Sequence, residues 1–285
     1  MIIVKLQGGL GNQMFQYAFG RSLSLRHNVS LKMDSSYLRK ENQSGRKFRL
    51  GGFNIDIPEA TAKEIERYCG TFQKIIDRIR TGNQKRCIVE HSPSFKPNIL
   101  LRNDGYFDGH WNNEKYFSDH ADVIRKDFTL KNSMGRAAEI LAQKIRAEKN
   151  PVSIHIRRGD YVTIKKIADV HGVLPLSYCE TAMKKIIEQF PDAHFFISSD
   201  DIAWAKENFP KKYPVTFVSS PEIPDFEELM LMSRCRHNII ANSTFSWWGT
   251  WLNINPEKIV IAPKQWFTDP NRRIENLIPQ SWIQI

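Results

Sequence analysis

The residues best suited to chemistry in this chain are His155, Arg157, Arg158 and Asp160, within the sequence HIRRGD. They directly follow the run 151–154, so they fall where a buried strand should end. Arginine presents a planar fork of N–H donors that matches paired phosphate oxygens, and open α/β sheets bind ligands outside the carboxyl ends of their strands. The segment therefore predicts binding of a nucleotide or nucleotide sugar. The alternative is an internal Arg–Asp bridge beside a buried histidine.

A glycine-rich turn at residues 8–11 is the second candidate. It follows an expected strand and opens a helix, where backbone N–H groups attract anions. The dinucleotide-binding fingerprint is not met, because Met14 stands where its third glycine should be. A plain strand-to-helix turn is the alternative. Asn12 and Gln13 favour a binding role, since both can donate and accept hydrogen bonds at a sugar hydroxyl.

Two further polar segments follow expected strands. Asp200 and Asp201 could accept hydrogen bonds from ribose or a base edge, although a helix cap would explain one of them. The sequence contains no Asp-x-Asp, so the arginines would have to neutralise a diphosphate without that metal-binding device. Ser243, Thr244 and Ser246 open another expected helix, a position that suits phosphate. The tryptophans that follow them are interpreted as core residues.

The elements that position these segments alternate between strands and helices, which is typical of an α/β fold with a mainly parallel sheet. The Lys-Asn-Pro break at 149–151 predicts a boundary between domains 1–150 and 151–285. In the poorly readable region 35–103, apolar spacing predicts a helix over 72–79. A further helix should begin with a capping box formed by Asp225 and Glu228. Strands are expected at 2–6, 29–34, 193–198, 215–218, 239–241 and 258–262, and helices at 13–27, 135–149, 183–190, 202–208 and 226–234.

Composition sets wider bounds on the function. The 285 residues suit two domains, and the net charge of +10 fits anionic partners or simply solvated helix faces. No secretory or membrane-spanning segment is expected. Cys69, Cys87, Cys179 and Cys235 lie far apart, which predicts reduced thiols, a cytoplasmic setting and no metal cluster.

Together these segments resemble the bacterial α1,2-fucosyltransferases of glycosyltransferase family eleven. The resemblance implies inverting transfer of L-fucose from GDP-β-L-fucose to the 2-hydroxyl of a terminal β-galactoside, without metal or cofactor, in the synthesis of surface glycans or O-antigen-type polysaccharides. It also implies a GT-B fold, in which two Rossmann-like domains with parallel sheets face a cleft. Residues 1–150 would be the acceptor side, and 151–285 would bind GDP-fucose. The segments that carry the resemblance are 8–13, 106–111, 155–161, 196–201 and 242–248.

The resemblance also implies roles for individual residues. Arg157 would contact the β-phosphate with help from Arg158, His155 would lie at the guanine, and Asn12 would position the reacting centre. Either Asp200 or Asp201 would recognise guanine, and the phosphate would meet hydroxyls among Ser243, Thr244 and Ser246. Acceptor-side candidates are Gln13, His110, Trp111 and Glu114. The general base stays open among Asp160, His110 and Glu114.

Two other functions compete with this one. The chain could use another nucleotide sugar or hydrolyse its donor, or it could bind anions, glycans or nucleic acid without chemistry. We expect no nucleic-acid partner, because the basic residues are dispersed and no nucleic-acid-binding motif occurs. Peripheral contact with the inner membrane is expected from the positive charge, particularly if the acceptor is lipid-linked.

Overall fold

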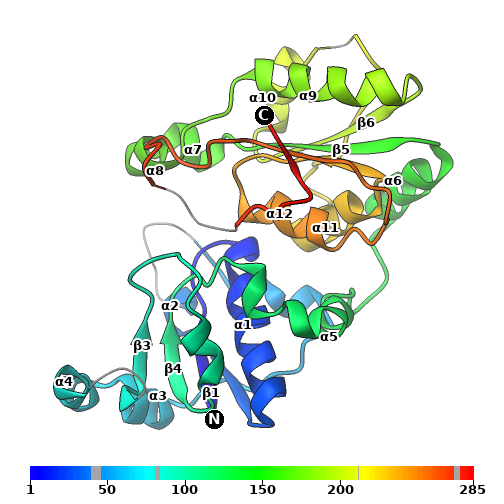
Figure 1. Cartoon of the computed structure of the whole chain (residues 1–285). Helices are drawn as coiled ribbons and strands as arrows, with labels where there is room; N and C mark the ends of the chain where they lie inside the picture. The colour runs from blue at the N-terminus through cyan, green and yellow to red at the C-terminus, as the bar shows by residue number, and fades with distance from the viewer. Residues whose placement is uncertain (40–45, 81–83, 211, 273–276) are drawn as a thin grey trace. The chain divides into compact units, whose positions relative to one another are not determined.

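The computed structural model describes residues 1–39, 46–80, 84–210, 212–272 and 277–285. It divides into two compact units (Figure 1). The first comprises Met1–Asn132 with Ile274–Leu277, and the second comprises Ser133–Arg273 with Ile278–Ile285. Each unit is an α/β layer structure around its own parallel sheet, so the predicted fold class is confirmed.

The first unit is built on a four-stranded parallel sheet in the order β2-β1-β4-β3. Its central strand β1 is a short apolar run with buried side chains, which is typical of a strand covered on both faces. Gly20 of α1 lets the helix approach that sheet, because a Cβ there would lie 2.7 Å from a methyl group of Val4. The main elements are β1 (Ile2–Lys5), α1 (Leu10–His27), β2 (Leu31–Asp34), β3 (Cys87–Val89) and β4 (Gly105–Asp108).

Shorter helices complete the first unit. They are α2 (Ser36–Arg39), η1 (Leu50–Gly52), α3 (Ala62–Cys69), α4 (Thr71–Ile79), η3 (Pro97–Leu101), η4 (Glu114–Tyr116), η5 (Ser118–His120) and α5 (Ala121–Asp127).

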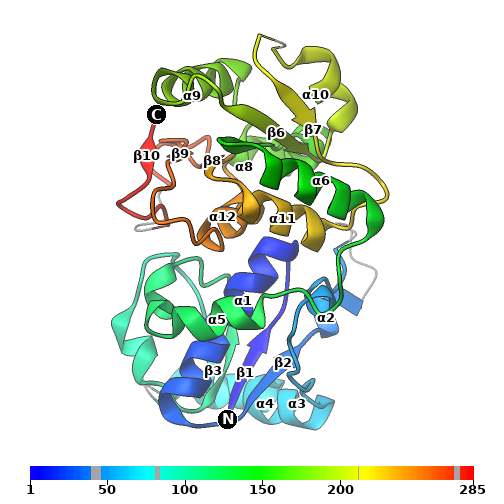
Figure 2. The same ribbon diagram turned by 90° about the vertical axis from the view of Figure 1, so that its right-hand side faces the viewer.

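The second unit contains a six-stranded parallel sheet in the order β10-β9-β8-β5-β6-β7 (Figure 2). Side chains of β6 alternate between its two faces: Phe195 and Ile197 pack into one apolar cluster, and Phe196 packs into the other. Helices thus cover both faces, as in a Rossmann-like layer. The strands are β5 (Pro151–Ile156), β6 (His194–Ser199), β7 (Val215–Phe217), β8 (His237–Ile239), β9 (Val260–Ala262) and β10 (Ile283–Gln284). The helices are α6 (Arg136–Ala147), α7 (Gly159–Thr163), α8 (Lys165–His171), α9 (Leu176–Gln189), α10 (Ile202–Asn208), α11 (Asp225–Arg234) and α12 (Thr244–Trp251).

The boundary between the units lies at residues 132 and 133, before α6, and not at the predicted 150. Ala138 and Ile145 of α6 pack with Phe196 and Leu231 of the second unit. The break at 149–151 is therefore the loop that joins α6 to β5. The Lys-Asn-Pro sequence correctly marks the end of a helix, but packing decides that α6 belongs to the second unit.

Two local predictions are wrong. Cys69 and Cys87 form a disulfide, because the end of α3 lies beside the start of β3, a proximity that spacing along the chain does not reveal. Cys179 and Cys235 are buried free thiols. Glu228 does not form a capping box: its carboxyl group bonds the hydroxyls of serines near the end of β6 and after β7. No helix among the described residues is long and apolar enough to cross a lipid bilayer.

Candidate functional site

The second unit gathers its candidate residues at the carboxyl ends of two neighbouring strands. β5 and β6 pair in parallel with Ile156 opposite Ser199. The segment that begins at Arg157 and the Asp200–Asp201 pair therefore leave the sheet side by side. Ligands of α/β sheets bind at this edge.

The arginines and aspartates form one ion cluster. Arg157 donates from Nη2 to Asp160 Oδ1 at 2.5 Å, and its Nη1 lies 2.9 Å from Asp200 Oδ2. The backbone N–H of Arg158 donates to Asp200 Oδ1 at 2.8 Å, and its Nε lies 3.3 Å from Asp201 Oδ2. The internal Arg–Asp bridges that were the alternative to a phosphate site are therefore present. The two bonds of Arg157 engage two of its five N–H groups, and contact with phosphate stays a prediction.

Gly159 is required by the shape of this cluster. A Cβ at this position would lie 2.3 Å from Asp200 Oδ2 and 3.0 Å from its Cγ. The carboxylate of Asp200 occupies the space that a side chain at this position would need. Gly159 is thus explained by the close approach of the segment after β5 to the Asp200 side chain, which follows β6.

The two adjacent aspartates have different roles. Asp201 caps α10, where its side chain accepts from the Trp204 backbone N–H at 3.2 Å, so the cap interpretation is confirmed for this residue. Asp200 instead bonds both arginines. The guanidinium of Arg158 lies 3.6 Å from the centre of the Trp204 ring, a cation–π contact that holds the guanidinium in place.

His155 is buried directly behind the arginines. Burial, followed by the charge of Arg157, lowers the pKa of His155 to about 3, so its imidazole is neutral at physiological pH. Its Nδ1 is buried and has no hydrogen-bond partner among the described residues. His155 lines a small pocket with Arg157, Arg158, Leu174 and Trp204. A neutral imidazole can both donate and accept, which suits a ligand with mixed polar edges.

The segment at 242–248 is tied to this cluster through Tyr161. The Tyr161 hydroxyl donates to the Asn242 carbonyl at 2.9 Å, and the Tyr161 ring lies 5.2 Å from the Arg157 guanidinium carbon. Ser243 caps α12, and Thr244 is half-buried. Ser246 is buried, with its hydroxyl 3.2 Å from the Ser243 carbonyl, and its contact with phosphate stays a prediction.

Trp247 and Trp248 are fully buried, which confirms that they are core residues.

Two acceptor-side candidates in the first unit, Gln13 and Trp111, are buried, and their acceptor contacts stay predictions. Gln13 is buried, and its amide bonds the Gly8 and Lys47 carbonyls and the Arg49 N–H at 3.0, 2.8 and 2.9 Å. It holds neighbouring loops together. Trp111 is buried and stacks on Phe19 with ring centres 4.3 Å apart. An amide and an indole serve packing as well as binding, and sequence alone does not separate these uses.

The other first-unit candidates have accessible surface. Asn12 is half-buried under the turn, where a Cβ on Gly8 would lie 2.6 Å from Asn12 Nδ2; Gly8 has a φ of 78°, which favours glycine. His110 is exposed in the loop after β4, and Glu114 is half-buried in η4.

Sequence reasoning missed Glu90, which fixes the loop that carries His110. One carboxylate oxygen of Glu90 accepts from the backbone N–H groups of His110 and Trp111, at 2.6 and 3.2 Å. Burial raises the pKa of Glu90 above its usual range. Trp111 has a φ of 53°, an uncommon conformation for a bulky residue that these bonds help to hold. Glu90 lies in the region 35–103, where the sequence carries few signals.

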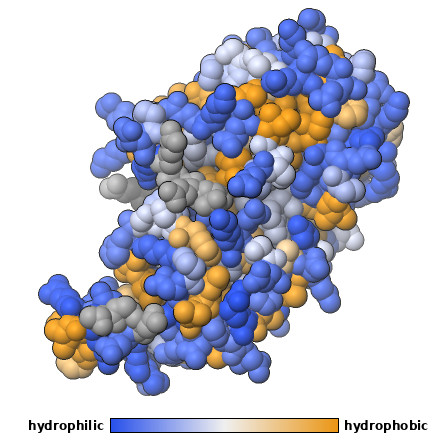
Figure 3. Space-filling view, in the orientation of Figure 1, coloured by the Kyte–Doolittle hydropathy of each residue, from blue (hydrophilic) through white to orange (hydrophobic). Residues whose placement is uncertain are grey.

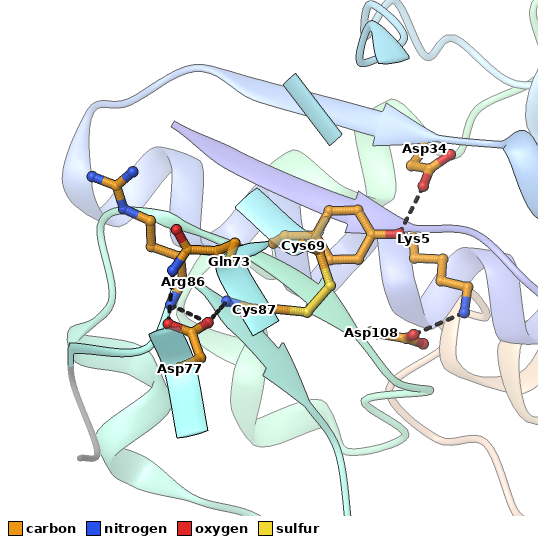
Figure 4. The surroundings of a disulfide bond; sticks show 9 residues. Lys5, Asp34, Cys69, Gln73, Asp77, Arg86, Cys87 and Asp108 are labelled. Carbon is orange, nitrogen blue, oxygen red and sulfur yellow. Dashed lines mark hydrogen bonds and ion pairs between the residues drawn. A yellow bond between two sulfur atoms is a disulfide. The ribbon is translucent and has the colours of Figure 1, made fainter. Parts of the chain in front are cut away.

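Lys5 and Asp108 were also missed. They form an ion pair of 2.8 Å at the carboxyl ends of β1 and β4 (Figure 4). A charged residue at the end of a short apolar strand was the signal that could have found them. The described residues hold no group of three or more potential metal ligands, and metal independence stays a prediction.

The model of the family "Glycosyl transferase family 11" matches residues 98–285. The chain is 36% identical to an Escherichia coli alpha-1,2-colitosyltransferase over 100% of its length and 99% of that protein. It is 34% identical to the Escherichia coli O-antigen biosynthesis glycosyltransferase WbnK over 98% of its length and 99% of that protein.

A solved structure shows the same fold. NodZ alpha-1,6-fucosyltransferase, soaked with GDP-fucose, superposes with a TM-score of 0.52 at 15% identity, over 88% of this chain and 92% of that one. NodZ comes from Bradyrhizobium. The predicted GT-B type of fold is thereby confirmed.

Proposed function

Because this chain belongs to glycosyl transferase family 11 and is therefore a glycosyltransferase, we propose that it transfers L-fucose from GDP-β-L-fucose to the 2-hydroxyl of a terminal β-galactoside, with inversion. The family relatives support an α1,2 linkage and a place in O-antigen-type polysaccharide synthesis. The donor site is supported by one observation above all: Arg157 and Arg158 are held in place at the carboxyl ends of β5 and β6.

In this proposal Arg157 stabilises the leaving group. Negative charge accumulates on the diphosphate as its bond to fucose breaks, and a guanidinium already oriented there requires no reorganisation. Asp160 and Asp200 provide that orientation, since each bonds one terminal nitrogen of Arg157. Two arginines beside three aspartates leave a formal charge of −1, so GDP must bind through N–H groups that the carboxylates do not engage.

We place guanine beside His155, across the mouth of this pocket, because the pocket itself has room for no more than a water molecule. The residues that line it include His155, Arg157, Arg158 and Tyr178, and Trp204 gives it an aromatic wall. A neutral imidazole can bond a base edge without the cost of burying a charge. Thr244 and the capping Ser243, at the start of α12, are the proposed phosphate hydroxyls.

The acceptor hydroxyl must lose a proton as it attacks. Asp160 is bonded to Arg157 at 2.5 Å, so we assign it to positioning that arginine. His110 and Glu114 stay the proposed alternatives for the base, with Asn12 near the reacting centre.

A second donor is favoured by a specific finding, the 36% identity to a colitosyltransferase. Colitose is fucose without its 3-hydroxyl group. A site built to bond that hydroxyl would reject the deoxy sugar strongly, whereas an apolar site discriminates weakly.

One experiment tests the proposal and separates the donors. GDP release is measured in EDTA from GDP-fucose and GDP-colitose, each with and without lactose, and the product linkage is determined. Lactose-dependent release from GDP-fucose with a 2-O-fucosylated galactose supports the proposal. A preference for GDP-colitose overturns the donor assignment, and release without acceptor indicates a hydrolase. If neither donor yields GDP and the protein does not bind GDP, the guanine-nucleotide site is wrong.

A further inference from the structure

Helix α4 (Thr71–Ile79) directs its apolar residues away from the protein. Phe72, Ile75 and Ile79 are 74%, 55% and 85% exposed. Residues with this spacing share one face of a helix, and in a globular protein such a face normally packs on the core. Figure 3 shows hydrophobic atoms on the surface at the place of α4 in Figure 1. The apolar spacing correctly predicted the helix, but its apolar face lies outward.

The orientation of α4 is held by polar contacts on its inner face. Gln73 and Asp77 are buried, and the Gln73 amide donates to Asp77 at 2.8 Å. Asp77 also accepts from the backbone N–H groups of Arg86 and Cys87, at 3.0 and 2.8 Å (Figure 4). The Cys69–Cys87 disulfide closes the base of the segment that carries the helix. A rotation that buried the apolar face would break these buried bonds.

Basic residues flank the exposed apolar stripe. At 100° per residue, Lys74 and Arg78 lie beside one edge of the stripe. Arg80, just after the helix, instead turns its guanidinium toward Asp77, with Nη1 3.8 Å from Oδ1. Lys74 and Arg78 are exposed. Asp77, the acidic residue of this helix, faces inward, where it accepts hydrogen bonds from Gln73 and the Cys87 backbone and pairs with Arg80. The outer surface of α4 is therefore apolar at its centre and positive along one side.

We propose that α4 docks the protein onto a membrane surface rich in anionic phospholipids. An apolar stripe bordered by lysine and arginine is the pattern of helices that lie in the plane of the lipid–water interface. Protein interfaces are instead depleted of lysine. The nine residues of α4 are far fewer than the roughly 20 needed to span a bilayer, so the helix lies along the surface. This inference does not depend on the identity of donor or acceptor.

The test is flotation of the full chain with vesicles of phosphatidylethanolamine and phosphatidylglycerol, compared with vesicles of phosphatidylcholine alone. The apolar variant Phe72→Ser/Ile75→Ser/Ile79→Ser should lower the partition coefficient at least about tenfold. Its matched control is Ile140→Ser/Ile254→Ser, which removes apolar side chains that are 58% and 79% exposed in the other unit. This control should bind vesicles as the wild type does.

A second pair of variants tests the charges. Lys74→Glu/Arg78→Glu should weaken binding to anionic vesicles by about fivefold or more for each residue, with less effect at high salt. Lys184→Glu/Lys185→Glu, an exposed pair on α9, is the control of equal charge and should change binding much less.

Three outcomes would overturn the proposal. The wild type could fail to float with anionic vesicles, or the controls could lose binding as strongly as the α4 variants. Light scattering could instead show a dimer that the apolar variant dissociates, in which case a second copy of this chain covers the face. Circular dichroism verifies folding, and GDP release in solution should be unchanged in both α4 variants, which separates docking from the proposed chemistry.

Discussion

A single guanidinium, that of Arg157, is the centre of the proposed donor site, because it bonds two carboxylates at once. Arg157→Ala should reduce kcat/KM about 100-fold or more, since one lost oxyanion-type donor costs roughly 3 kcal/mol. Arg157→Lys keeps the charge but loses the fork, so it should recover only part of the activity. Steady-state GDP release measures both. Equal activity of Arg157→Ala and wild type would contradict the role.

Gly159 gives a prediction that depends on shape alone. Gly159→Ala places a methyl group 2.3 Å from the Asp200 carboxylate, which must move and release Arg157. We expect at least a tenfold loss of turnover, measured as GDP release, since small misplacements at a reacting centre are costly. Gly51→Ala is the control, because a Cβ there meets Phe48 at an ordinary 3.7 Å. Unimpaired turnover in Gly159→Ala would show that the Asp200 contact is dispensable.

The raised pKa of Glu228 predicts that the free energy of unfolding depends on pH. Burial is the largest cause that raises its pKa to about 7 from the usual 4.5. The native state therefore keeps the proton to higher pH than the unfolded chain, and this residue makes the free energy of unfolding fall as pH rises from about 4.5 to 7. Glu228→Gln should remove up to about 3 kcal/mol of that fall. Urea unfolding at pH 5 and pH 8 measures this change in the free energy of unfolding. If that free energy changes equally with pH in Glu228→Gln and wild type, the prediction is wrong.

At the scale of elements, the disulfide joins α3 to β3 around α4. Closing a loop of this size stabilises a fold by about 3 kcal/mol in the chain-entropy view. Cys69→Ser should therefore lower the free energy of unfolding by about that amount, and reductant should lower that of the wild type equally. Thiol titration of the denatured, unreduced protein should find two thiols. Four thiols would show that the bond does not form.

Elements also show why some sequence predictions succeeded. Several predicted elements agree closely with the structure, because apolar runs and caps are local signals. They are the strand 193–198 (β6), the strand 215–218 (β7) and the helix 202–208 (α10). The helix at 72–79 was predicted from spacing alone, but which face it buries depends on its neighbours. The boundary at 150 was wrong for the same reason, since α6 joins the second unit by packing.

For the whole molecule, the residues along the chain were enough to predict an α/β fold of two domains, and the sequence already shows the order of the five segments that carry the family resemblance. It also determined the positions of Arg157, Arg158, Asp200 and Asp201 at strand ends, because parallel strands carry their ligands there. Folding was needed to show that Asp200 holds both arginines while Asp201 caps a helix, and that Gln13, Trp111 and Ser246 are buried. It also decided the Cys69–Cys87 pair and the outward face of α4. The physical reason is distance: periodicity and capping act within a few residues, whereas burial and pairing depend on segments that meet only after folding.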